Sequence, residues 1–221
     1  MTIASRNGFA RSLFLTTAAL LAAVSLSAAD FTVDKAGAPP TEGVAPAAIE
    51  MVGAEGVAVK DGAGKVVAEF WMRTTAFEGD GPSGLGIRFD TIPEGSFLGL
   101  VRYPEGGSDF REQAVPAGVY TLRYGLHPEN GDHMGVAPSR DFALLSPAAL
   151  DNEIAKNYGD FDSLMDLSFE VGNPHPTVAR VELPEGDDEP NLWENDYEHW
   201  VLDLKTGSDV VGFVVYGHSE E

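Results

Sequence analysis

The feature that most constrains the fold is a run of alternating side chains at residues 119–126. Large apolar or aromatic residues occupy every second position there: Tyr120, Leu122, Tyr124 and Leu126. The positions between them carry Val119, Thr121 and Arg123. Successive side chains of an extended strand point to opposite faces, so this period of two predicts a half-buried β-strand.

Shorter runs of the same kind predict further strands, separated by turns rich in glycine. Two hairpins are expected: residues 57–60 with 65–72, joined by 61–64, and residues 199–204 with 209–216, joined by 205–208. Single strands are expected at residues 97–103, 140–145 and 178–183. This spacing is typical of an antiparallel all-β domain.

A small helical insertion interrupts the β pattern. Ser146 supplies a capping hydroxyl before Pro147, which predicts a helix that continues to about Lys156. A second helix is expected over residues 161–169. The predicted fold is therefore mainly β, an antiparallel β-sandwich of immunoglobulin or prealbumin type, with a two-helix excursion around residues 147–170.

The first 29 residues have the three parts of a secretory signal peptide. Arg6 and Arg11 precede an apolar run over residues 13–26, and Ser27 and Ala29 form a small-residue cleavage site before Asp30. A membrane anchor is the alternative, but the run is shorter than the about 20 residues that a span needs. We therefore expect cleavage, no transmembrane segment afterwards, and a periplasmic or extracellular location.

The rest of the chain divides into two parts. Residues 30–50 are rich in alanine, proline and glycine, which predicts a flexible lead-in arm, and residues 51–221 are expected to form a single β-sandwich domain. The formal charge of −21 opposes binding to nucleic acid, which is a polyanion. The absence of cysteine excludes disulfides and thiol chemistry. We expect a monomer.

Residues 113–124 (QAVPAGVYTLRY) carry a turn-and-strand phrase that resembles one in exported bacterial β-sandwich proteins of unknown function, including the DUF2911 type. The similarity extends through residues 132–145, and the Pro-Ala-Gly-x-Tyr part also occurs in prealbumin-like and carboxypeptidase-regulatory-like modules. The resemblance implies a fold and no activity, so no catalytic residue is carried over from it.

Histidines supply the candidate metal ligands. His127 and His133 flank a polar loop and Met134 follows them, a set of donors that could suit copper or zinc. His175 lies between two prolines, which could present its imidazole to the same ion. The alternative is a polar turn built for backbone reasons around Asn130, in which case no cofactor is bound.

Aromatic residues beside carboxylates supply the candidate ligand-binding site. Trp193 and Tyr197 lie in an acidic segment, and such rings can stack on sugars while neighbouring oxygens accept hydrogen bonds. No nucleophile elbow, phosphate-binding loop or dinucleotide fingerprint is present. The sequence thus favours an exported, non-catalytic binding or accessory protein for a carbohydrate, an envelope component or a protein. A metal-binding protein and a hydrolase with an unrecognised site remain alternatives.

Overall fold

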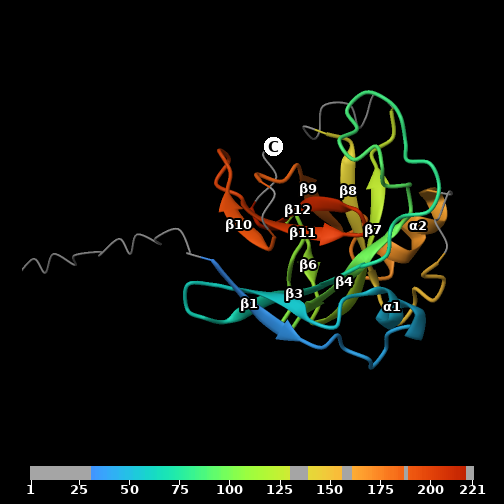
Figure 1. Cartoon of the computed structure of the whole chain (residues 1–221). Helices are drawn as coiled ribbons and strands as arrows, with labels where there is room; N and C mark the ends of the chain where they lie inside the picture. The colour runs from blue at the N-terminus through green and yellow to red at the C-terminus, as the bar shows by residue number, and fades with distance from the viewer. Residues whose placement is uncertain (1–30, 130–138, 156–160, 187–188, 218–221) are drawn as a thin grey trace, which may run out of the picture.

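The computed structural model describes residues 31–129, 139–155, 161–186 and 189–217. The predicted signal peptide lies outside these residues. Within them the chain forms two helices and twelve strands (Figure 1), which are β1 (Thr32–Gly37), α1 (Pro46–Met51), β2 (Gly56–Lys60), β3 (Val66–Met72), β4 (Phe97–Tyr103), β5 (Gly107–Ser108), β6 (Ala114–Val115), β7 (Gly118–Leu126), β8 (Asp141–Pro147), α2 (Phe161–Phe169), β9 (Val178–Glu182), β10 (Asn191–Glu194), β11 (Trp200–Thr206) and β12 (Asp209–Tyr216).

Ten of these strands form one antiparallel sheet in the order β1-β2-β3-β4-β7-β8-β9-β12-β11-β10, and β5 and β6 form a separate hairpin. The large sheet curves until it is nearly closed into a barrel. The prediction of a mainly β, antiparallel fold is confirmed, since 42% of the chain is strand and 8% is helix. The more specific sandwich arrangement stays a prediction.

Side chains bridge the gap between the two edges of the sheet, β1 and β10. The ring of Phe31, just before β1, lies 5.7 Å from the ring of Trp200 on β11 and 5.1 Å from that of Tyr216 on β12. These contacts join the first edge of the sheet to strands near the other edge. The barrel is therefore closed here by aromatic packing.

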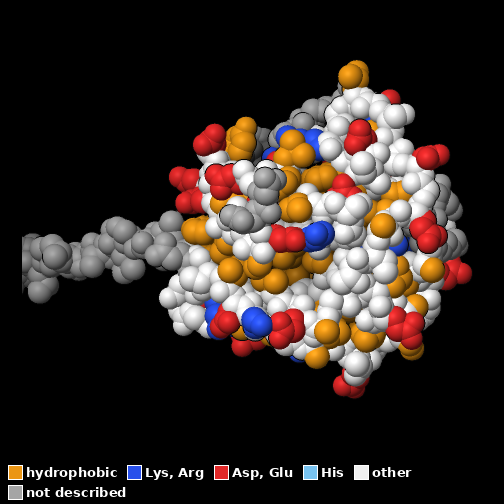
Figure 2. Space-filling view, viewed as in Figure 1, with side chains coloured by type: hydrophobic (Ala, Val, Ile, Leu, Met, Phe, Trp, Pro, Cys, Tyr) orange, Lys and Arg blue, Asp and Glu red, His pale blue; other side chains and the backbone are white. Residues whose placement is uncertain are grey.

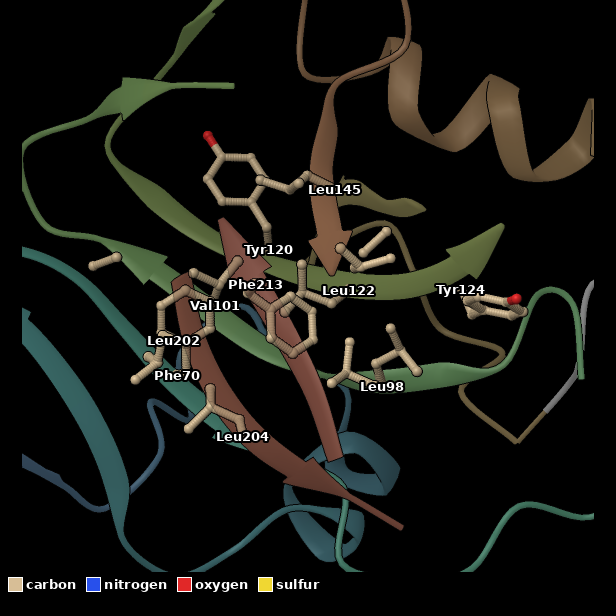
Figure 3. Close-up of a cluster of buried hydrophobic side chains, with 14 of the residues drawn as sticks. Phe70, Leu98, Val101, Tyr120, Leu122, Tyr124, Leu145, Leu202, Leu204 and Phe213 are labelled. Atoms are coloured by element: carbon tan, nitrogen blue, oxygen red, sulfur yellow. The ribbon is translucent and has the colours of Figure 1, made fainter. Parts of the chain in front are cut away.

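The interior of the barrel is the main hydrophobic core. In Figure 3, side chains of β4 and β7 point toward those of β11 and β12. All four large residues of the alternating run are buried in this core, as the period of two predicts: Tyr120, Leu122, Tyr124 and Leu126. The two predicted hairpins are also confirmed, as β2 with β3 and β11 with β12.

The outer face of β7 is buried as well, which the sequence does not predict. Arg123 and Thr121 on this face are both 0% exposed. The segment after β8 covers them, and Asp151 accepts hydrogen bonds from both side chains. The strand is thus buried on both faces because an ion pair fastens a loop over its polar side.

The same contacts explain why the helix expected over residues 147–156 is wrong. Pro147 still belongs to β8, where it pairs with Tyr120. A turn follows, with the amides of Leu150 and Asp151 donating to the Pro147 carbonyl, and residues 148–155 contain no helix. The Asp151 side chain forms a buried ion pair with Arg123 instead of facing solvent from a helix.

Residues 32–51 are part of the folded domain, in contrast to the expected flexible arm. Strand β1 pairs with β2 along its length, and α1 begins at Pro46, a residue well suited to a first helical turn. Val44 and Ala48 are buried beside Trp71 in a second core outside the barrel. Packing on the outer face of the sheet therefore orders a segment whose composition suggests a linker.

The second predicted helix is confirmed as α2. Leu164 is fully buried and packs on β8 and β9 in a third, smaller core with Phe142, Leu144 and Val178. In the part of the chain that the structure describes, neither helix is long and apolar enough to cross a membrane.

The turn-and-strand phrase at residues 113–124 has a clear structural role. It forms β6, a turn and the start of β7, and the Tyr120 hydroxyl donates a 2.7 Å hydrogen bond back to the Pro116 carbonyl. This bond fixes the turn against the strand that follows. The proline and the tyrosine of this phrase therefore each have a local structural role in forming the turn.

Candidate functional site

The antiparallel register gathers several strand ends at one end of the barrel. Tyr103 at the end of β4 pairs with Gly118 at the start of β7, and Trp200 at the start of β11 pairs with Tyr216 at the end of β12. The β5–β6 hairpin and its flanking loops lie between β4 and β7, so they are held at this same end. Ligand sites are common at the mouths of β-barrels.

A groove of about 610 Å³ opens at this end. Its walls come from β3, the loop around β5, and the end of β12, which are far apart in the sequence. The lining residues, which we call the aromatic groove, are Phe31, Asp61, Val67, Ala68, Tyr103, Gly106, Gly107, Ser108, Asp109, Phe110, Glu112, Val214, Val215, Tyr216 and Gly217. Figure 2 shows hydrophobic side chains exposed on this face, over the region of β1, β3 and β6.

Four aromatic rings line the groove. Phe31 and Tyr216 contact each other, and Tyr216 remains 46% exposed. Tyr103 packs edge-on against Tyr120, and a side chain at Gly107 would meet the Tyr103 ring at 3.1 Å. Glycine at that position therefore lets the backbone of the hairpin lie directly on the ring. The fourth ring that lines the groove is Phe110.

Buried Asp109 holds the hairpin wall of the groove in place. Its carboxylate accepts hydrogen bonds from the amides of Arg111 and Gln113, from the Gln113 side chain, and from the amide of Val178 on β9. The amide of Phe110 also donates to the Val178 carbonyl at 3.2 Å. The wall is thus fixed to the barrel before any ligand binds, which lowers the entropic cost of binding.

The electrostatic character of the groove is acidic. Among its described lining residues, Asp61, Asp109 and Glu112 are acidic and none is basic. Burial, with a further contribution from Asp109, raises the pKa of the Tyr103 hydroxyl. Tyr103 therefore keeps its proton at neutral pH.

The predicted ligand residue Tyr197 lies close to the groove. Its ring is 53% exposed and stacks on His199 at 6.0 Å, and His199 in turn packs edge-on against Phe110 at 5.6 Å. A side chain on Gly217 would meet the His199 ring at 2.5 Å. These contacts form a continuous row of rings from the groove to the exposed Tyr197.

Trp193, the other predicted ligand residue, is part of the sheet. It lies in strand β10, half-buried, and its Nε1 donates a 3.0 Å hydrogen bond to the fully buried carboxylate of Asp203. Asn191 donates to the same carboxylate. The polar atom of Trp193 is therefore used to hold an edge strand, and the residue does not line the aromatic groove.

Two of the predicted metal ligands come together in space. His127 and His175 line one cavity of about 420 Å³ beside α2, together with Asp162 and Asp166. His133 and Met134 lie outside the described residues. Among residues 31–129, 139–155, 161–186 and 189–217, no group of three histidine, aspartate or glutamate side chains is arranged to hold a metal ion.

The sequence analysis missed the groove itself. Phe31, Tyr103, Phe110 and Tyr216 come from four separate segments, and only the strand register brings them together. One signal was available: Tyr103 and Tyr216 each end a predicted strand, where side chains point toward loops. The chain matches no protein-family model, no curated protein and no solved structure. Fold and groove together define a mainly β protein with a preformed, aromatic-lined groove.

Proposed function

We propose that this protein is a non-catalytic binding protein that holds a carbohydrate in the aromatic groove. The observation that supports this most directly is the convergence of four rings around one hollow of about 610 Å³. Sugar rings present apolar C–H faces that stack on aromatic side chains, and their hydroxyls donate to carboxylates at the edge. The groove offers both kinds of contact.

The depth and the rigidity of the groove support the same proposal. Phe31 is 8% exposed and supports Tyr216, which is 46% exposed, so an inner ring holds an outer ring in place. The hydrogen bonds of Asp109 fix the opposite wall. Preformed walls with partly exposed rings are suited to a ligand of several sugar units lying along the groove.

The test is a titration of the purified protein with tetrasaccharides of glucose, galactose, glucosamine and N-acetylglucosamine, followed by tryptophan fluorescence. Trp200 reports on the groove because its ring lies 5.7 Å from Phe31. Tyr216→Ala removes an exposed ring from the groove, and Leu183→Ala is the matched control, since Leu183 is 50% exposed after β9 at the other end of the barrel.

We expect at least one tetrasaccharide to bind. Tyr216→Ala should weaken that binding about tenfold, because a stacked ring contributes about 1.4 kcal/mol, and Leu183→Ala should leave it unchanged. If no oligosaccharide binds, or if both variants weaken binding equally, the proposal is wrong.

Metal binding is the second candidate function. The specific observation in its favour is that His127 and His175, which are distant in the sequence, line one cavity with Asp162 and Asp166. Mass spectrometry of the metal content, with copper and zinc titrations, tests it. Stoichiometric metal that is lost in His127→Ala/His175→Ala would support it, and metal-free protein with an unchanged melting temperature would exclude it.

The proposal also includes the location of the protein and its relationship to other exported proteins. The leader pattern of residues 1–29 supports export to a periplasm or beyond, where glycans of the cell envelope are available. The phrase at residues 113–124 supports a relationship to exported β-sandwich proteins. We expect the protein to work as a monomer, which sedimentation of the purified protein would test.

A further inference from the structure

We infer that the ligand chain leaves the aromatic groove beside Gly217 and continues onto Tyr197, which forms an outer subsite for a further sugar ring. The protein therefore binds long, linear oligosaccharides more tightly than short ones. This inference rests on the proposed function and adds to it the length of the ligand and the path that it follows.

Tyr197 is supported in the same way as Tyr216, the exposed ring of the groove. Tyr216 is 46% exposed and contacts the ring of Phe31, which is 8% exposed. Tyr197 is 53% exposed and stacks on the ring of His199, which is 2% exposed. In each pair a buried ring holds an exposed tyrosine, whose remaining surface can stack on the C–H face of a sugar.

Tyr197 is linked to the end of the groove through Gly217. This glycine lines the groove directly after Tyr216. A side chain at this position would meet the His199 ring at 2.5 Å, so only glycine lets the groove wall lie against that ring. The imidazole that supports Tyr197 therefore also contacts the backbone of the groove.

The position of Tyr197 is fixed by a tight turn. The Asn195 side chain accepts hydrogen bonds from the amides of Tyr197 and His199 at 2.9 and 3.0 Å. Glu198, between them, has the left-handed backbone conformation with a φ of 59°, which is uncommon for a residue other than glycine. These bonds order the backbone that carries the ring before a ligand arrives, which lowers the entropic cost of binding.

The distribution of exposed rings favours this path. Among the residues that the structure describes, three aromatic side chains are exposed, Tyr197, Tyr216 and Phe169, and Phe169 lines the separate cavity beside α2. Phe110 also lies next to His199, but its ring meets the imidazole edge-on and has the Arg180 guanidinium 5.0 Å from its centre. Phe110 is therefore a wall of the groove, and Tyr197 is the exposed ring that extends it.

The experiment measures affinity against ligand length by calorimetry, with the dimers, tetramers and hexamers of glucose, galactose, glucosamine and N-acetylglucosamine. For the sugar that binds, we expect the affinity to rise about tenfold from dimer to hexamer, because one more ring is stacked. Backbone amide shifts in ¹⁵N-labelled protein locate the effect. The shifts of residues 195–199 should change with the hexamer and not with the dimer.

Variants at Tyr197 test the outer subsite directly. Tyr197→Ala should leave the affinity for the dimer unchanged and remove most of the rise with length. The turn survives this change, since its hydrogen bond uses the main-chain amide of Tyr197. Tyr197→Phe keeps the ring and should keep the rise.

Two further variants serve as comparisons. Phe169→Ala removes a ring that is 42% exposed beside α2, and it should change neither the affinity for the dimer nor the rise with length. Tyr216→Ala removes a ring of the groove itself, so it should weaken binding at every length.

The outcomes separate this inference from the proposed function. Equal affinity for dimer and hexamer, or an unchanged rise in Tyr197→Ala, would overturn the inference and leave carbohydrate binding in the groove in place. A loss of equal size at every length in Tyr197→Ala would also overturn it, since Tyr197 would then act on the groove itself. Failure of every oligosaccharide to bind would instead refute the proposed function.

Discussion

The ion pair between Arg123 and Asp151 gives the sharpest prediction about stability. Both side chains are 0% exposed, and the guanidinium donates to both carboxylate oxygens at 2.6 and 2.8 Å. It also donates to the carbonyls of Gly95 and Glu153. Arginine stays charged in proteins, so Asp151→Leu leaves a buried cation without the carboxylate that pairs with it.

Removal of one partner from a buried ion pair costs about 3–5 kcal/mol. For a chain of this size, that loss lowers the melting temperature by about 10 °C. Arg123→Met/Asp151→Leu removes both charges together, so the double variant should cost less than the sum of the two single variants. We expect a coupling free energy of about 2 kcal/mol or more.

The assay is urea unfolding of the four proteins, followed by tryptophan fluorescence. Glu55→Gln is the control, because its pair with Lys35 is largely exposed and its loss should hardly move the unfolding midpoint. The reasoning is refuted if Asp151→Leu destabilises no more than this control. Strict additivity of the two single variants would refute it as well.

Three further predictions follow from buried groups. Burial raises the pKa values of Tyr103 and Tyr124 in the folded protein above the ordinary value of 10.0. Below pH 10 the folded and unfolded proteins both keep these protons, but above pH 10 the unfolded protein loses them first. The free energy of unfolding should therefore fall by up to about 1.4 kcal/mol per pH unit for each tyrosine, and a free energy of unfolding from urea titrations that stays constant above about pH 10 would contradict this. Gly99→Ala would place a methyl 2.6 Å from a backbone carbonyl of β3 and should destabilise by about 1–3 kcal/mol; unchanged urea unfolding would count against it. Val44→Ala should cost about 2 kcal/mol in thermal unfolding because the segment between β1 and α1 is core, and an unchanged melting curve would show that it is not.

Local patterns predicted β2, β3, β4, β7, β8, β9, β11 and β12, because each is encoded within a few residues, but they missed β1, β5, β6 and β10. The alternation at residues 119–126 placed Tyr120 and its three partners in the core, and the glycine-rich turns at residues 61–64 and 205–208 marked two hairpins. The second helix was also predicted, since residues 161–169 carry their own apolar face over β8.

Contacts between distant segments explain what the sequence could not predict. Arg123 looks solvent-facing by its period, but Asp151 from another segment buries it. Residues 32–51 look like a linker, yet Trp71 and Leu100 provide the surface on which they pack. The candidate binding site shows the same division. Tyr197 was predicted from its sequence neighbours, whereas the groove beside it forms only because the strand order brings distant segments together.

The measurement that tests the central claim most directly is a map of backbone amide shifts in ¹⁵N-labelled protein during titration with the four tetrasaccharides in turn. The account predicts saturable shifts at residues 106–112 and 214–217, the two walls of the aromatic groove. Shifts that centre on His175 and α2, or the absence of shifts at these walls, would contradict it.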